Sequence, residues 1–231
     1  MDLKCLQKHI IQMLGIVLIG VLVIYFWPVV TTPHGVFWRM GGILWPSNAF
    51  FHLFHFSHIF FATATSFITL YGIWKSFAIS AALSIILPIC ICTVSDVLLP
   101  YVGGILLNVD MALHMCLTCN FSAMMVFVLS GLLLGTLFCY VPVLKKQEPH
   151  FHFASHILHG FLSCLSSLVY LVGFGFFQWQ AYFIPVLLLM LVVVIIPCVV
   201  SDYLAPQLIS RWLLKKSDSQ DLCVTSCNDK H

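Results

Sequence analysis

Charged residues are scarce in this chain of 231 residues: Asp, Glu, Lys and Arg together make up only 8% of it. An average soluble domain carries roughly 25%. Hydrophobic residues account for 61%, and the mean hydropathy is +1.04. This composition excludes a water-soluble fold, and the apolar runs are long enough to cross hydrocarbon. The sequence therefore predicts an integral membrane protein.

The motifs of several enzyme and transporter classes are also missing. The chain contains no Walker loop, dinucleotide fingerprint, H-E-x-x-H or G-x-S-x-G, so ATP-driven transport by this chain alone and the familiar hydrolase mechanisms lack support. Its ten cysteines fall short of the roughly 8 to 10% that marks a disulfide scaffold. Most of them lie in apolar segments, where cysteine behaves as a small hydrophobe. Nothing in the sequence indicates a nucleic-acid partner.

Six apolar segments have about the 20 residues that a bilayer-spanning helix needs. With a cytoplasmic N-terminus, nine of the ten Lys and Arg residues lie on the cytoplasmic side, and only Arg39 lies outside. This predicts an all-α polytopic protein with both termini in the cytoplasm. The predicted spans are 10–30, 58–74, 77–99, 121–143, 154–174 and 181–204.

The segments between and after the spans predict little soluble structure. Residues 32–56, which contain Trp38 and Trp45, are typical of an interfacial loop. The apolar run 111–144 is too long for one untilted crossing, so we expect an interfacial or re-entrant piece at 111–120; two helices are the alternative. We expect residues 1–210 to form a single transmembrane domain and the polar segment 211–231 to be a disordered cytoplasmic tail.

Two sequence patterns recur in the same order. The stretch from Cys92 to Pro100 shares C-x-V-S-D-x-L-x-P with the stretch from Cys198 to Pro206, and His52-Leu-Phe-His-Phe-Ser-His-Ile shares H-x-x-x-x-S-H-I with the segment starting at His150. This predicts a duplication, with repeat one at about 1–105 and repeat two at about 106–210. Three spans in each copy would invert the second copy relative to the first.

Histidines and aspartates gather near the predicted membrane faces. Ionisable residues inside a membrane are costly and point to function. Imidazole and carboxylate groups suit zinc, iron, manganese, nickel or cobalt, so we expect a divalent transition metal as ligand or cargo. The candidate ligands at the outer face are His52, His55, His58, Asp96, Asp110 and His114, and those at the inner face are His150, His152, His156, His159 and Asp202.

Other roles for these residues stay open at this point. Asp96 and Asp202 also fit groups that orient a histidine or carry a proton. Histidines near helix ends are commonly interfacial side chains, and Ser-Asp before proline commonly ends a helix. The C-x-x-C pair Cys116 and Cys119 fits a soft-metal site or a redox dithiol, although a structural role is the more common one in a chain rich in cysteine.

The leading hypothesis is a small secondary carrier for a divalent transition-metal cation, with a His/Asp site at each mouth and alternating access between the inverted halves. Protonation of the histidines would then assist release. The alternatives are a membrane-embedded metalloenzyme acting on a lipid or small molecule, a haem-binding subunit and an assembly subunit. The expected partners are the lipid bilayer, a small cation or small-molecule substrate, and a second copy of the chain.

Overall fold

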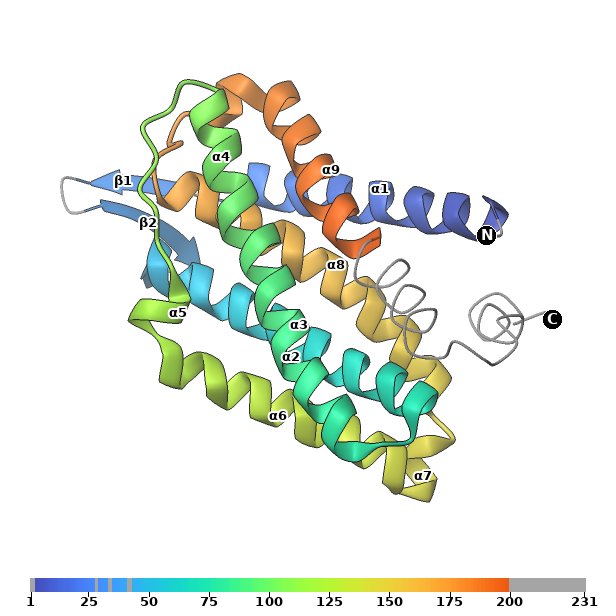
Figure 1. Ribbon diagram of the computed structural model, residues 1–231. Helices are drawn as coiled ribbons and strands as arrows, with labels where there is room; N and C mark the ends of the chain where they lie inside the picture. The colour runs from blue at the N-terminus through green and yellow to red at the C-terminus, as the bar shows by residue number, and fades with distance from the viewer. Residues whose placement is uncertain (1–2, 28, 33–34, 41–42, 200–231) are drawn as a thin grey trace.

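The computed structural model describes residues 3–27, 29–32, 35–40 and 43–199, and this part of the chain is mostly helical (Figure 1). Six long helical segments form a bundle, with a small sheet at one end. The long segments are α1 (Leu3–Tyr25), α2 (Ser47–Trp74), α3 (Phe77–Thr93) continued by the π-helix η1 (Val94–Leu98) and α4 (Leu99–Leu106), α6 (Phe121–Tyr140), α8 (Glu148–Gly173) and α9 (Phe183–Val199). The short elements are α5 (Cys116–Cys119), α7 (Pro142–Lys145) and the 3₁₀ turn η2 (Trp179–Tyr182).

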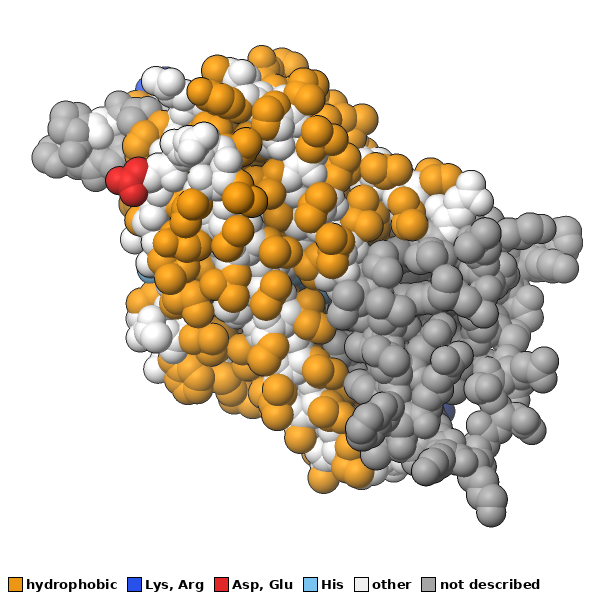
Figure 2. All heavy atoms as spheres, turned by 45° about the horizontal axis from the view of Figure 1, so that its top comes forward, with side chains coloured by type: hydrophobic (Ala, Val, Ile, Leu, Met, Phe, Trp, Pro, Cys, Tyr) orange, Lys and Arg blue, Asp and Glu red, His pale blue; other side chains and the backbone are white. Residues whose placement is uncertain are grey.

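Five helical segments of the described chain are long and apolar enough to cross a membrane. Hydrophobic side chains cover most of the described surface in the view of Figure 2, as expected of helices that face lipid tails. The apolar part of α1, Ile10–Tyr25, is shorter than these five segments, so the predicted count of six spans is not confirmed. The five crossing segments are Ser47–Trp74, Phe77–Leu106, Phe121–Tyr140, Ala154–Gly173 and Trp179–Pro197.

Helix α2 lies at the centre of the bundle and packs against α3, α6 and α8, while α1 packs against α8 and α9. Gly131 and Gly135 of α6 face the backbone of α2. A Cβ at either glycine would collide with the carbonyl oxygen of Phe60 or Ala64. The small-xxx-small pattern therefore brings the two helix backbones into close contact.

The segment 32–56 differs from the predicted loop. It contributes to a three-stranded antiparallel sheet of β1 (Val29–Thr32), β2 (Gly35–Met40) and β3 (Ile43–Pro46), in which Trp38 pairs with Trp45. Its β-branched and aromatic residues favour strands. Helix α2 begins at Ser47 rather than at residue 58, so the predicted all-α class is corrected to a mostly helical fold with a small sheet.

The span predicted to end at residue 99 continues to Leu106. Pro100 has no N–H and cannot donate to the carbonyl oxygen of Asp96, so regular α-helical bonding fails there. The π-helical turn Val94–Leu98 accommodates this gap and keeps the helix continuous. Asp96 was predicted to close the helix; the structure corrects this and places it inside the helix.

The two ends of the bundle are distinct (Figure 1). The sheet and residues 107–120 lie at one end, which we call the sheet end. The turn between α2 and α3 lies with α7 at the other, the α7 end. Residues 107–115 are not helical, and α6 starts at Phe121, which agrees with one span preceded by a non-spanning piece. The predicted tail lies outside the described residues, and the orientation in the membrane stays a prediction.

Candidate functional site

Two histidines and a cysteine meet at the sheet end of the bundle. His52 comes from α2, His114 from the segment 107–115, and Cys119 from the end of α5. The Nε2 atoms of His52 and His114 are 3.0 Å apart, and Cys119 Sγ lies 3.3 Å from His114 Nε2. All three potential ligand atoms lie within 4.8 Å of one another. We call this group the sheet-end site.

The dimensions of the sheet-end site are close to those of a tetrahedral metal centre. With metal–nitrogen bonds of about 2.0 Å and metal–sulfur bonds of about 2.3 Å, neighbouring ligand atoms are about 3.3 Å apart for two nitrogens and about 3.5 Å for nitrogen and sulfur. The observed separations are only slightly shorter. Cys119 is exposed, and Asn120 Nδ2 lies 3.1 Å from His52 Nε2. The geometry is therefore compatible with a metal ion held by these three protein ligands.

His114 is held in place although its segment is not helical. Its ring stacks on Phe174 with centroids 4.9 Å apart, and its backbone N–H donates to the Tyr170 hydroxyl at 3.1 Å. That hydroxyl donates in turn to the carbonyl oxygen of Ala112 at 3.1 Å. Burial, with a smaller contribution from His55, lowers the pKa of His114. The ring is therefore neutral near pH 7, the form that binds a metal.

The two cysteines of the C-x-x-C pair are not equivalent. Cys116 is buried, and burial raises its pKa to about 12, so it stays a protonated thiol. Cys119 is exposed and faces His114. A redox dithiol needs a reactive thiolate of lowered pKa. Of the two, Cys119 alone therefore faces His114, and Cys116 packs in the core.

A second polar group lies inside the bundle and is centred on Asp96. Its Oδ2 accepts hydrogen bonds from Nδ1 of His55 at 2.9 Å and Nδ1 of His58 at 2.8 Å. Its Oδ1 accepts from the hydroxyls of Ser95 at 2.7 Å and Ser163 at 3.2 Å. All five side chains are buried. We call this group the Asp96 cluster.

Local helix geometry builds the Asp96 cluster. The spacing of three residues puts His55 and His58 on one face of α2. The π-helical turn carries Asp96 toward them, and Ser167 of α8 donates to the Ser95 carbonyl oxygen at 3.1 Å, so a backbone acceptor near the π turn is satisfied. A carboxylate inside a membrane helix is tolerated when it is paired in this way. The cluster therefore ties α2, η1 and α8 together.

His159 lies against this cluster instead of at a separate face. Its Nε2 is 3.4 Å from Nε2 of His58, and the sulfur of Cys92 is 3.7 Å from the same His58 nitrogen. The prediction that His58 and His159 lie at opposite membrane faces is therefore wrong. His58 is 11 residues from the sheet-end terminus of α2, and His159 is 14 from that of α8. At 1.5 Å per residue both lie about 17 to 21 Å along their helices from the sheet end.

The remaining predicted ligands lie outside these groups or outside the described residues. Asp110 is exposed, and His156 is half-buried one turn from His159 toward the α7 end. His150 and His152 lie in the first turns of α8, and their side chains are not among those described. Asp202 lies outside the described residues, and the predicted inverted repeat as a whole is not confirmed. Sequence reasoning missed Cys92, Ser95 and Ser163; the first two lie in the repeated C-x-V-S-D motif, and Ser163 has no comparable signal.

Comparison of the chain with models of known families, with curated proteins and with solved structures gives no match. The fold and the site therefore define the class. The chain is a multi-pass membrane protein by the length and composition of its helices, and its His and Cys side chains are placed so that they could hold a metal ion.

Proposed function

We propose that the protein is a small membrane carrier that binds a divalent transition-metal cation at the sheet-end site and moves it through the bundle. The observation that carries this proposal is the convergence of His52, His114 and Cys119, whose ligand atoms all lie within 4.8 Å of one another. One partly exposed site that joins a crossing helix to a surface segment is a suitable entry point for an ion.

The ligand set selects the class of cation. Imidazole and thiolate groups bind borderline and soft metals, of which Zn²⁺ is the representative divalent ion. Ca²⁺ and Mg²⁺ prefer oxygen ligands, which the sheet-end site does not offer from His52, His114 or Cys119. The substrate we propose is therefore a divalent ion of the zinc class.

Polar residues continue from the sheet-end site into the bundle. His52, His55 and His58 follow one another at three-residue intervals along α2, each about 4.5 Å further along the helix axis. Beyond His58 lie His159 and a pocket that Thr65 and Ser66 help to line. A purely structural metal site at the bundle end does not need such a path, because polar groups within a membrane are costly. This supports movement of the ion over simple binding.

The test is metal binding and flux with the purified chain. We expect His52→Ala to weaken Zn²⁺ binding at least about 100-fold, because it removes one of three ligands. Zn²⁺ uptake into proteoliposomes should fall with it. Asp110→Asn is the matched control, since Asp110 is exposed near the same end and lies outside the site. If wild-type protein binds no Zn²⁺, or if flux is the same in His52→Ala and wild type, the proposal fails.

A second candidate is a membrane-embedded metalloenzyme, which the exposure of Cys119 and the set of only three protein ligands favour. A metal with three protein ligands and one bound water can activate that water for hydrolysis of a lipid or small molecule. The same protein preparation separates the two functions. A carrier shows metal flux across sealed vesicles, whereas an enzyme binds the metal without flux and loses lipid hydrolysis in His52→Ala.

A further inference from the structure

Three side chains from three helices converge near the middle of the bundle. His58 Nε2 of α2 lies 3.4 Å from His159 Nε2 of α8 and 3.7 Å from Cys92 Sγ of α3. All three residues are buried. A tetrahedral metal centre separates two nitrogens by about 3.3 Å and nitrogen from sulfur by about 3.5 Å. Both distances from His58 therefore match those of ligands that share one ion.

Asp96 fixes the form of the His58 ring that a metal needs. A carboxylate only accepts hydrogen bonds, so the Nδ1 that lies 2.8 Å from Asp96 Oδ2 carries the hydrogen. In the neutral ring the lone pair is then on Nε2, which faces His159 and Cys92. Histidine ligands of metals commonly donate their other N–H to a carboxylate, which orients the ring and strengthens it as a ligand.

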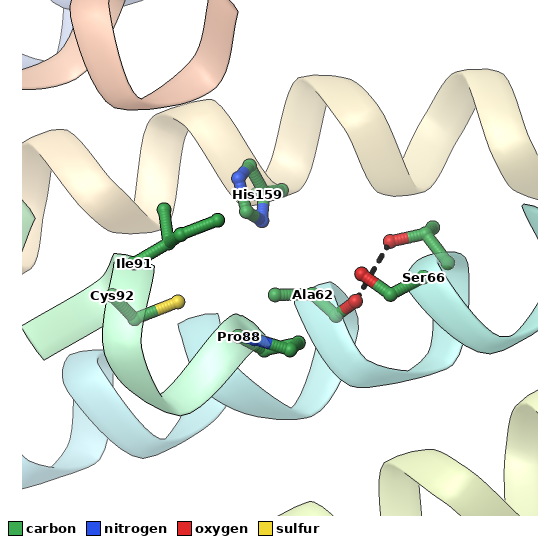
Figure 3. Close-up of a pocket in the computed structure, with 7 residues that line it drawn as sticks. Ala62, Ser66, Pro88, Ile91, Cys92 and His159 are labelled. Atoms are coloured by element: carbon green, nitrogen blue, oxygen red, sulfur yellow. Dashed lines mark hydrogen bonds between the residues drawn. The ribbon is translucent and has the colours of Figure 1, made fainter. Parts of the chain in front are cut away.

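A pocket provides room beside these groups (Figure 3). In Figure 3 the sulfur of Cys92 and the ring of His159 face the space from opposite sides, with Ala62 and Pro88 along its floor. The group is more open than the sheet-end site, because its three ligand atoms do not all lie within 4.8 Å of one another. An ion held by His58 would draw these two side chains toward each other. The residues that line the pocket are Ala62, Thr65, Ser66, Pro88, Ile91, Cys92 and His159.

We infer that His58, His159 and Cys92 form a second binding position for a divalent ion of the zinc class, which we call the central site. Binding replaces the hydrogen of the Cys92 thiol with the metal and releases one proton. The thiolate and the Asp96 carboxylate then carry two negative charges against the two positive charges of the ion. This neutrality suits a position deep in the membrane, where an uncompensated charge is costly.

The two positions contain the same kinds of ligand. Each combines one histidine of α2, one histidine from elsewhere in the chain and one cysteine. His52 and His58 are six residues apart on α2, which corresponds to about 9 Å along its axis. A role of the central site in transport rests on the carrier function proposed above. Metal binding at the central site does not depend on that function.

Cobalt titration of the full-length protein in detergent tests the central site, with Co²⁺ alone as the probe. Thiolate ligands give Co²⁺ a charge-transfer absorption in the near ultraviolet. We expect wild type to bind two Co²⁺ per chain, and Cys92→Ser and Cys119→Ser to lose one each, with about half of that absorption. The double variant should lose all of it. Cys90→Ser is the matched control, since Cys90 is exposed two residues from Cys92 on the same helix.

The outcomes separate this inference from the proposed function. If Cys92→Ser binds as much Co²⁺ as wild type with unchanged absorption, the central site is excluded and the sheet-end site stands. If Cys92→Ser loses one ion while Cys119→Ser behaves as wild type, the central site is supported and the sheet-end site fails. If Cys92→Ser does not fold, His159→Gln decides, because it keeps Cys92 and should still lose one Co²⁺; two ions bound to that variant would overturn the inference.

Discussion

The sheet-end site and the Asp96 cluster lie on the same helix but depend on different parts of the fold. His52 meets ligands from a non-helical segment and from a four-residue helix, and Cys119 is exposed to solvent. His55 and His58 donate to Asp96, which also accepts from Ser163 of another crossing helix, and all four are buried. A surface site can use water to complete its coordination and charge, whereas a buried group must find every partner within the protein.

This difference assigns separate energetic roles to the two regions. Loss of a partner in the Asp96 cluster leaves buried donors or a buried charge without compensation, so it acts on stability. Loss of a ligand at the sheet end exposes a polar group to water, so it acts on metal binding with little effect on folding. Substitutions that change the free energy of unfolding without changing metal affinity, or the reverse, test whether the two regions have these separate roles.

The largest expected effect comes from Asp96→Ala. The change removes the acceptor for His55, His58, Ser95 and Ser163 at once and leaves buried donors unpaired. Breaking one partner of a buried charged network costs about 3 to 5 kcal/mol. We expect a loss of this size in the free energy of unfolding, measured by denaturant titration of the purified protein in detergent.

Cys119→Ala provides the comparison from the sheet end. Its side chain is exposed, and substitutions at such positions usually change stability by about 0.5 kcal/mol or less. It should lose metal binding at the sheet-end site while unfolding as wild type does. Equal destabilisation by Asp96→Ala and Cys119→Ala would show that the two regions do not have separate roles.

The sequence predicts the membrane class and most of the long helices, because both follow from local hydrophobicity. The length of the apolar run alone predicted a span at 121–143, and the helix α6 ends only three residues earlier, at Tyr140. The sheet was missed because the aromatic residues of 32–46 fit both a strand and an interfacial loop. Asp96 was expected near a helix end because Ser-Asp before a proline commonly ends a helix. No local sequence pattern predicts the π-helical turn that lets this helix continue.

The candidate site was predicted in its residue types but not in its arrangement. His55 and His58 lie three residues apart and share one face of α2. Spacing within one helix cannot show which other helix approaches that face, so His159 was assigned to a different site. Ser163 was not predicted because serine is common in the apolar segments of this chain. Only tertiary packing brings its hydroxyl to 3.2 Å from Asp96 Oδ1.

A smaller effect is expected from Ser163→Ala, which removes one donor to the Asp96 carboxylate. Hydrogen bonds to charged groups contribute about 1.5 to 3 kcal/mol, and the separation of 3.2 Å favours the lower end of that range. We expect a loss of about 1.5 kcal/mol in the free energy of unfolding. A loss above about 3 kcal/mol, the upper end of that range, would mean that Ser163 contributes beyond this one bond.

Ser166→Ala is the matched control for this change. Ser166 lies on the same helix and is equally buried, but its hydroxyl has no hydrogen-bond partner among the described residues. Its removal should leave stability within about 0.5 kcal/mol of wild type or raise it slightly. Comparable losses in the two variants would attribute the Ser163 effect to packing and not to the carboxylate.

The smallest expected effect concerns the accessibility of the two cysteines at the sheet end. A water-soluble maleimide should modify Cys119, which is exposed, and leave Cys116 unmodified, because Cys116 is buried and its raised pKa of about 12 keeps it a thiol. Zn²⁺ at ten times its dissociation constant leaves about one-tenth of the sites free, so Cys119 should react about tenfold more slowly. Mass spectrometry of the labelled peptides measures both. Modification of Cys119 at the same rate with and without Zn²⁺ would remove this cysteine from the ligand set and leave His52 and His114 as an incomplete pair.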